Sequence, residues 1–221
     1  IIVIGFFVWF FIFFLQVPEL NIPKNSSEKE KTVLIDNWLE KLNSERKFIG
    51  EILIMKNGKP SLEKTYGFTN SKKTKQLNNN SSFRLASISK QFTASLIMLL
   101  KEKELINYDD VVSKYISNFP YNKVTIRNLL NQTSGIPDSY LNLAEKAKDE
   151  IGILTNQKAI KLIIENTPKA NFEPNDKYEY SNTNYIALAR IIELVSNQSF
   201  ENFMANNIFI PLGMNDTRVW N

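Results

Sequence analysis

The 221-residue chain contains no cysteine and no histidine. Without cysteine it can form no disulfide, no thiolate metal site and no cysteine acyl-enzyme. Without histidine it cannot use a serine–histidine–aspartate triad or a histidine-ligated metal, which leaves carboxylate-only metal sites. Glycine and proline are scarce, with seven and eight residues, which excludes collagen-like and low-complexity architectures. Among the remaining side chains, serine with lysine is the best pairing of a nucleophile and a base.

A strong excess of one charge is also missing. The chain has 27 basic and 23 acidic residues, for a net charge of +4. This balance is too even and too scattered to indicate nucleic-acid binding. With 43% hydrophobic and 23% charged residues, the composition is that of one folded domain of ordinary size, or part of a larger one.

One long apolar run stands at the start of the sequence. Residues 1–15 carry no charge and no polar side chain, and include six phenylalanines and one tryptophan. A helix of this length spans about 22 Å, short of a bilayer unless upstream residues extend it. We expect a membrane anchor or a signal segment over residues 1–17 and a polar tether over 18–31, with the rest of the chain exported. A buried core helix is the alternative.

Periodicity predicts strands first and helices later, which is typical of an α+β fold. Asn57-Gly58 stands between two strand-like runs and predicts a β-hairpin. Residues 69–82 read as a solvated loop. A largely apolar stretch at 91–100 predicts a buried helix. Further helices are predicted over residues 32–47, 125–131, 155–166 (with Thr155 as N-cap) and 183–197.

The spacing Ser-x-x-Lys puts a hydroxyl and an amine one helical turn apart. It occurs at Ser26/Lys29, Ser44/Lys47, Ser61/Lys64 and Ser87/Lys90. Because the chain has 17 serines and 22 lysines, about two matches arise by chance. A lysine acts as a base only where its surroundings disfavour the ammonium. Only Ser87/Lys90 stands at the start of an apolar helix, so we favour this pair as nucleophile and base. The alternative is that Ser87 is a helix cap and Lys90 a solvated neighbour.

A second motif, Tyr-x-Asn, occurs at Tyr140/Asn142 and at Tyr180/Asn182. The second pair lies in a polar turn directly before a predicted helix. A phenol can relay a proton, and an amide can hold both a lysine and a substrate. The alternative is an ordinary turn with an N-cap at Ser181 or Asn182.

Taken together, the motifs resemble the serine β-lactamase-related hydrolases, the group around class C β-lactamases, DD-carboxypeptidases and related esterases. The likeness begins at Phe83–Thr93 (FRLASISKQFT), the nucleophile helix of that family. It continues through LINYDDVVSKY, VTIRNLLNQTSGIPD and FEPNDKYEYSNTNYIALARIIELVSNQSF to IPLGMNDT at 210–217. It covers nearly everything after Ile49.

The resemblance implies a β-lactamase/transpeptidase-like fold, in which an antiparallel sheet is flanked by helices with a helical subdomain. It also implies an acyl-enzyme mechanism without metal or organic cofactor. Ser87 would be the nucleophile, Lys90 its base and Tyr180 the proton shuttle, while Asn182 would position lysine and substrate. The substrate would be a β-lactam, a D-Ala-D-Ala peptide or a small ester or amide. The expected partners are this small-molecule or peptidoglycan-type substrate and the membrane, but no nucleic acid.

Three departures from the family pattern stand out. Gln132 replaces the usual histidine of a His-Thr-Ser-Gly stretch, for which we expect only a packing change. Asn175 replaces a common glycine, and asparagine tolerates the positive φ that such a turn needs. The last family motif, Lys-Thr-Gly or His-x-Gly on a later strand, does not occur, so we expect residues 32–221 to be a domain incomplete at its C-terminus. A non-catalytic binding module and an inactive remnant remain alternatives.

Overall fold

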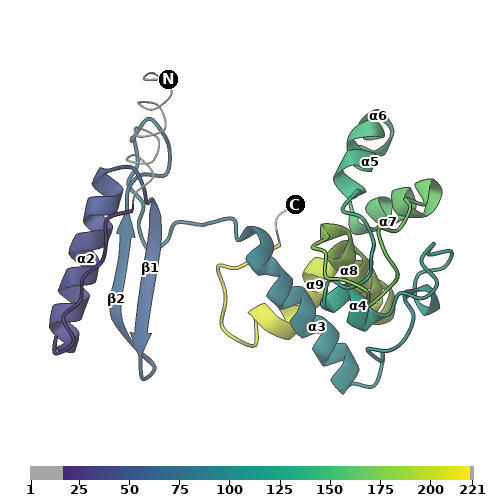
Figure 1. Ribbon diagram of the computed structural model, residues 1–221, viewed down its shortest axis with the longest axis horizontal. Helices are drawn as coiled ribbons and strands as arrows, with labels where there is room; N and C mark the ends of the chain where they lie inside the picture. Colours follow the sequence, from purple (N-terminus) through teal and green to yellow (C-terminus); the bar gives the residue numbers. More distant parts are fainter. Residues whose placement is uncertain (1–16, 220–221) are drawn as a thin grey trace. The chain divides into compact units, whose positions relative to one another are not determined.

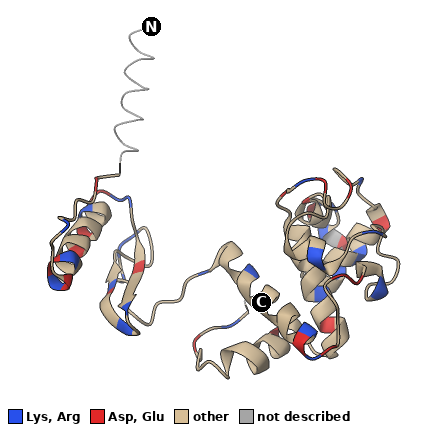
Figure 2. Cartoon of the chain, turned by 60° about the horizontal axis from the view of Figure 1, so that its bottom comes forward, with Lys and Arg blue, Asp and Glu red and all other residues tan. Residues whose placement is uncertain are grey.

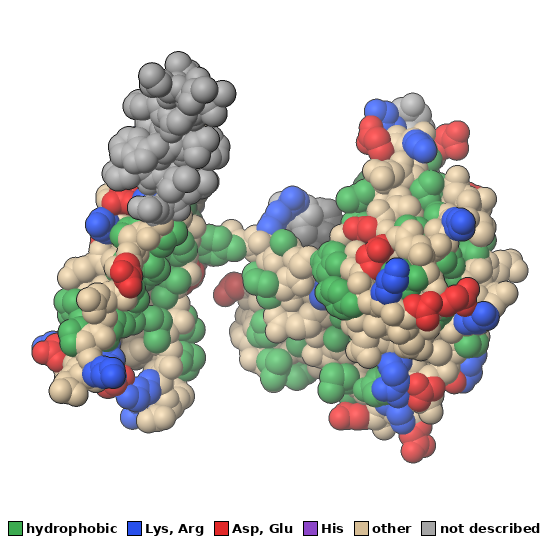
Figure 3. All heavy atoms as spheres, viewed as in Figure 1, with side chains coloured by type: hydrophobic (Ala, Val, Ile, Leu, Met, Phe, Trp, Pro, Cys, Tyr) green, Lys and Arg blue, Asp and Glu red, His purple; other side chains and the backbone are tan. Residues whose placement is uncertain are grey.

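The computed structural model describes residues 17–219 of the chain. The chain consists of two compact units, and the boundary between them in the sequence falls between Phe83 and Arg84. The first unit joins one helix to a β-hairpin, and the second consists of helices and loops (Figure 1). Acidic and basic residues are interspersed along both units (Figure 2). On the face of the second unit that Figure 3 draws, they are mixed with hydrophobic side chains, so neither sign dominates that face.

Helix α2 (Glu28–Ser44) opens the first unit. It begins earlier than the predicted start at residue 32, because Ser27 and Glu30 form a capping box across the first turn. Part of the stretch predicted as a tether is therefore helical. Leu39 and Leu42 are the buried residues of this helix, and they pack against the hairpin around Tyr66.

The predicted hairpin is confirmed. Strands β1 (Gly50–Lys56) and β2 (Lys59–Tyr66) pair antiparallel, with Gly50 opposite Tyr66 and Lys56 opposite Lys59. Asn57 and Gly58 both have positive φ, as a two-residue turn that matches the twist of the strands requires. Lys64 on β2 donates to Asp36 and Glu40 of α2, which ties the hairpin to the helix. Among the described residues these two strands form the only sheet.

The second unit is built around helices α3 (Lys90–Glu102) and α8 (Asn182–Ser196). The helices between them are α4 (Ile126–Leu130), α5 (Tyr140–Lys146), α6 (Lys148–Ile151) and α7 (Asn156–Asn166), and α9 (Phe200–Met204) follows α8. Short 3₁₀ turns lie at η1 (Ala86–Ser89) and η2 (Val112–Lys114), and η3 (Ala205–Phe209) is a π-helical turn.

The core of this unit lies where α3 and α8 meet. Leu96, Ile97 and Leu100 from α3 and Leu188 and Ile191 from α8 are fully buried in one cluster. The predicted buried helix is therefore present, but it is buried on one side, since Met98 is exposed.

Helices α4, α7 and α8 lie close to the predicted positions at 125–131, 155–166 and 183–197. Thr155 caps α7 as predicted, by accepting the backbone N–H of Lys158. No helix was predicted at α5, α6 or α9, which have four to seven residues each.

No helix among residues 17–219 is long and apolar enough to cross a membrane. The predicted anchor or signal segment at 1–17 lies outside the described residues except for Val17.

The close packing of Gly135 against the backbone at Phe172 can be tested by substitution. The φ of Gly135 is +76°, and a Cβ built on it would lie 2.0 Å from the carbonyl oxygen of Phe172. Gly213 has a similar φ of +67° but nothing within 4 Å of such a Cβ. We expect Gly213→Ala to cost about 1–2 kcal/mol of unfolding free energy through its backbone alone. Gly135→Ala should cost about 2–5 kcal/mol because overpacking adds to that strain.

The measurement is chemical denaturation of the two variants beside the parent protein. Equal losses of stability for the two variants would contradict the close approach of the segment around Phe172 to Gly135.

Candidate active site

Ser87 lies on the 3₁₀ turn η1, directly before α3, and its side chain is exposed. The preceding residue, Ala86, has a φ of +46°, an unusual value for a residue with a Cβ. Ser87 is therefore neither inside α3 nor its N-cap, because Ser89 holds the N-cap position. As the second residue of the turn, Ser87 has a backbone N–H without a partner inside the turn, where it can face a ligand oxygen.

Lys90 is the first residue of α3, and its side chain links Ser87 to the start of α8. Its Nζ donates to Ser87 Oγ at 3.1 Å and to Asn182 Oδ1 at 2.7 Å. The ammonium also stands over the rings of Tyr180 and Tyr185, 4.9 and 5.5 Å from their centroids. These contacts hold a half-buried amine in one place beside the hydroxyl of Ser87.

Tyr180 closes the cluster from the other side. Its hydroxyl lies 2.6 Å from Ser87 Oγ and donates to Asn182 Oδ1 at 3.2 Å. Hydrogen bonding to Lys90, and then to Ser87, lowers the pKa of the Tyr180 phenol below its ordinary value. A phenol shifted in this direction gives up its proton more readily, which suits it to a part in proton transfer.

All four residues singled out from the sequence, Ser87, Lys90, Tyr180 and Asn182, are thus linked by one set of hydrogen bonds in the second unit. Two of these bonds, Ser87–Tyr180 and Lys90–Asn182, bridge more than 90 positions of sequence. The other Tyr-x-Asn pair, Tyr140 and Asn142, lies in the first turn of α5.

The three rival Ser-x-x-Lys pairs all lie in the first unit, where their lysines meet acidic groups or solvent. Lys64 donates to Asp36 and Glu40, and these bonds raise its pKa well above the ordinary value. Such a lysine stays protonated and cannot serve as a base. Lys47 pairs with Glu45, and Lys29 is exposed in the first turn of α2. The sequence-based choice of Ser87/Lys90 agrees with these surroundings.

The segment that carries Tyr180 rests on a buried polar layer. Gln132 Oε1 accepts the backbone N–H of Ser181 at 3.0 Å and the side-chain amide of Asn184 at 2.6 Å. The backbone carbonyl of Gln132 accepts the N–H of Glu179. Ser134 donates to Asn184 at 2.7 Å. We expected Gln132 to make only a packing change, but it also holds the segment by hydrogen bonds on both sides of Tyr180.

The turn at Asn175 forms as predicted. This residue has a φ of +75°, in the region that asparagine tolerates, and its backbone N–H donates to the carbonyl of Thr133. Asn128 donates its side-chain amide to Asn175 Oδ1 at 2.6 Å. The asparagine thus replaces glycine in this turn and gains a side-chain contact.

Sequence reasoning missed Asp138. Its carboxylate accepts two hydrogen bonds from Asn182, one from the backbone N–H at 3.0 Å and one from the side-chain amide at 2.8 Å. The residue is part of the stretch VTIRNLLNQTSGIPD that carries the family resemblance, but a lone aspartate in a loop gives no signal of the partner it meets 44 positions later.

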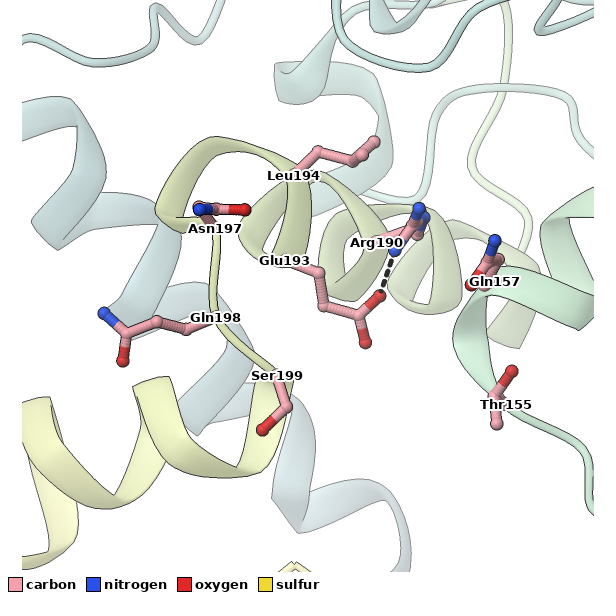
Figure 4. Close-up of a pocket in the computed structure, with 8 residues that line it drawn as sticks. All are labelled: Thr155, Gln157, Arg190, Glu193, Leu194, Asn197, Gln198 and Ser199. Atoms are coloured by element: carbon pink, nitrogen blue, oxygen red, sulfur yellow. Dashed lines mark hydrogen bonds and ion pairs between the residues drawn. The ribbon is translucent and has the colours of Figure 1, made fainter.

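A pocket of about 460 Å³ lies elsewhere in the second unit, among α7, α8 and the start of α9 (Figure 4). Its charged side chains are Arg190 and Glu193, which pair with each other at 2.8 Å. Glu193 also accepts the side-chain amide of Asn156. The two charged side chains of the pocket are therefore paired with each other. Among the described residues, no group of three or more acidic side chains could hold a metal ion.

A serine hydroxyl between an amine and a phenol, with a backbone N–H beside it, has the parts needed to form and break an acyl-serine bond. The geometry therefore defines a candidate site of the serine–lysine–tyrosine type.

Comparison with known proteins identifies the family. The family model described as Beta-lactamase matches residues 35–221. The chain belongs to the beta-lactamase family, whose fold is of the α+β class with helices around a sheet.

Among the relatives, penicillin-binding protein 4* of Bacillus subtilis is 39% identical over 194 residues, which cover 88% of this chain and 43% of that protein. A penicillin-binding protein from Bacillus halodurans superposes with a TM-score of 0.71 at 26% identity, over 82% of this chain and 56% of that one. The octameric penicillin-binding protein homologue from Pyrococcus abyssi gives a TM-score of 0.70 at 30% identity, over 82% and 43%. The chain thus spans about half the length of these relatives or less.

The lowered pKa of Tyr180 can be measured. Replacing Lys90 with methionine removes the hydrogen bond and the positive charge that favour the phenolate, so the pKa of Tyr180 should rise toward about 10. Ultraviolet difference titration follows phenolate formation. Subtracting the Tyr180→Phe titration isolates this tyrosine among the eight in the chain. A pKa that does not move in Lys90→Met would show that the lysine is not the source of the shift.

Proposed function

We propose that this chain carries the catalytic serine, lysine and tyrosine of a hydrolase that works through an acyl-enzyme on Ser87. One observation carries the proposal. Ser87 Oγ lies within hydrogen-bonding distance of both Lys90 Nζ, at 3.1 Å, and Tyr180 OH, at 2.6 Å. Membership of the beta-lactamase family supports the same assignment.

In the proposed reaction, Lys90 acts as the base that takes the proton of Ser87 as Oγ attacks the carbonyl carbon of the substrate. The backbone N–H of Ser87 donates to the oxygen that gains negative charge. As the tetrahedral intermediate collapses, Tyr180 passes a proton to the leaving amine or alcohol and regains one from the lysine. A water molecule then attacks the acyl-serine, and its proton returns through the same groups. The products are a carboxylic acid and the regenerated serine.

Asn182 has a positioning part in this scheme. Its Oδ1 accepts from both Lys90 and Tyr180, so one amide oxygen sets the distance between the base and the proton shuttle. Its place at the start of α8, beside Ser87, also suits it to contact a bound substrate.

For the substrate, we propose a β-lactam, a D-Ala-D-Ala peptide or a small ester or amide. Two relatives bear the name penicillin-binding protein, and a third is called a homologue of one. Penicillins are β-lactams, whose strained amide acylates a serine of this kind. The apolar sequence of residues 1–15 supports a reaction outside the cytoplasm, at a membrane, where peptidoglycan-type substrates would be met.

The test is covalent labelling of the full-length protein with a fluorescent penicillin and with a fluorophosphonate, followed by mass spectrometry of the labelled peptide. We expect the label on Ser87. Ser87→Ala should abolish labelling and leave the melting temperature within a few degrees of the parent value, because the side chain is exposed.

Ser95→Ala is the matched control. It removes an exposed hydroxyl from α3 that bonds only locally, to the carbonyl of Gln91, and it should label like the parent. If the parent protein folds but takes neither reagent, the chain is a binding module rather than a hydrolase. Labelling that persists in Ser87→Ala would place the nucleophile elsewhere.

A further inference from the structure

Asp138 lies in the loop between α4 and α5, and its two carboxylate oxygens are both taken up by one residue of the site. Oδ1 accepts the backbone N–H of Asn182 at 3.0 Å, and Oδ2 accepts the side-chain Nδ2 of Asn182 at 2.8 Å. Within residues 17–219, Asp138 forms no hydrogen bond or ion pair with Ser87 or Lys90, so its hydrogen bonds reach these two residues only through Asn182.

The chemistry of the two side chains fixes the direction of the Asn182 amide. A carboxylate can only accept hydrogen bonds, whereas an amide has a donating NH₂ at one end and an accepting oxygen at the other. With Asp138 on one side, the NH₂ must face the carboxylate, and the oxygen must then face Lys90 and Tyr180. The opposite orientation would set the NH₂ against the Lys90 ammonium, donor against donor, and the oxygen against the carboxylate.

We propose that Asp138 is a positioning residue that locks the Asn182 amide in the orientation which presents Oδ1 to Lys90 and Tyr180. This inference rests on the proposed function, because it concerns how the same site is held ready for acylation.

The charge of Asp138 favours a geometric role over an electrostatic one. A negative charge near Tyr180 works against the phenolate, and Asp138 acts on the pKa of that phenol in the upward direction, against the larger effect of Lys90. Because the Asp138 carboxylate opposes ionisation of Tyr180, its contribution to the site comes from the two hydrogen bonds that it accepts from Asn182.

A purely structural role is the competing explanation. Ser181, the N-cap residue of α8, makes no side-chain capping bond, and Asp138 accepts the N–H of the first helical residue in its place. Removing the carboxylate would therefore loosen the helix start even if the amide direction had no effect on the reaction. The test must separate loss of a cap from loss of the amide orientation.

Asp138→Asn is the decisive variant because it has the same shape but one acceptor fewer. Its side-chain oxygen can accept only one of the two bonds from Asn182, and its NH₂ meets the other as donor against donor. In the full-length protein, we expect the acylation rate of Ser87 by a fluorescent penicillin to fall by about 10–100-fold. Asp109→Asn is the matched control, since both oxygens of Asp109 are likewise bound by one partner, Arg127, away from the site, and its rate should stay within twofold of the parent.

A double-mutant cycle with Asn182→Ala distinguishes the two roles. If Asp138 acts by orienting the amide, Asp138→Asn should change the acylation rate by less than about threefold once that amide is gone. If Asp138 only caps α8, the substitution should cause the same fold loss in both backgrounds, because the backbone N–H of residue 182 remains. Asn182→Ser serves as the second background if Asn182→Ala does not fold.

Equal losses in the two backgrounds, or no loss from Asp138→Asn in the parent, would overturn the proposal. Failure of the proposed function looks different, because then the parent protein itself takes no label.

Discussion

The hydrogen bond from Lys90 Nζ to Asn182 Oδ1 is the contact on which the site depends. It is 2.7 Å long and joins the first residue of α3 to the first residue of α8, 92 positions later. It can form only where the two helices start side by side, and the fully buried Leu96, Ile97 and Ile191 hold them there. Core packing, rather than the polar bond, sets the distance between the helix starts, because burying a side chain of this size contributes about 1.5–3 kcal/mol. The hydrogen bond between Lys90 and Asn182 can form because the packing has already brought the two helix starts together.

Beneath the site, the molecule keeps polar groups in its interior, which is favourable only when they are paired. Gln132, Ser134 and Asn184 are each at most 6% exposed and are joined by short hydrogen bonds, although Gln132 Nε2 has no hydrogen-bond partner among the described residues. This buried polar layer orients the backbone between Tyr180 and Asn182, because Gln132 Oε1 accepts the N–H of Ser181. Asp138 holds the next N–H along the chain. The backbone N–H groups of Ser181 and Asn182 are therefore held from two points of the same loop between α4 and α5, which leaves this part of the backbone little freedom to turn its side chains.

The sequence allowed prediction of those parts of the site whose signal is local. Ser87/Lys90 and Tyr180/Asn182 each lie within three residues, so a short motif carries them, and the apolar stretch after Lys90 separated the pair from its three rivals. The hairpin was likewise predictable from Asn57-Gly58, because a two-residue turn leaves few conformations. Asp138 was not predictable, since its contact with Asn182 spans 44 positions and depends on the path of a loop. The early start of α2 at Glu28 was missed because a capping box outweighed the polar composition of the segment.

The exposure of the reacting groups shows what kind of stabilisation this site can have. Ser87 is exposed and Tyr180 is 43% exposed, so water screens their interactions, and isolated contacts of this kind contribute little to stability. The same groups nevertheless have fixed positions, because Asn182 Oδ1 receives two donors and the amide that carries it is held by Asp138. Because these side chains are already held in place, they need no further ordering when a substrate binds. A substrate that covers Ser87 would exclude water and strengthen each of these contacts together. The arrangement thus suits a site whose electrostatic effect develops only when it is occupied, with its geometry set in advance by the packing of α3 against α8.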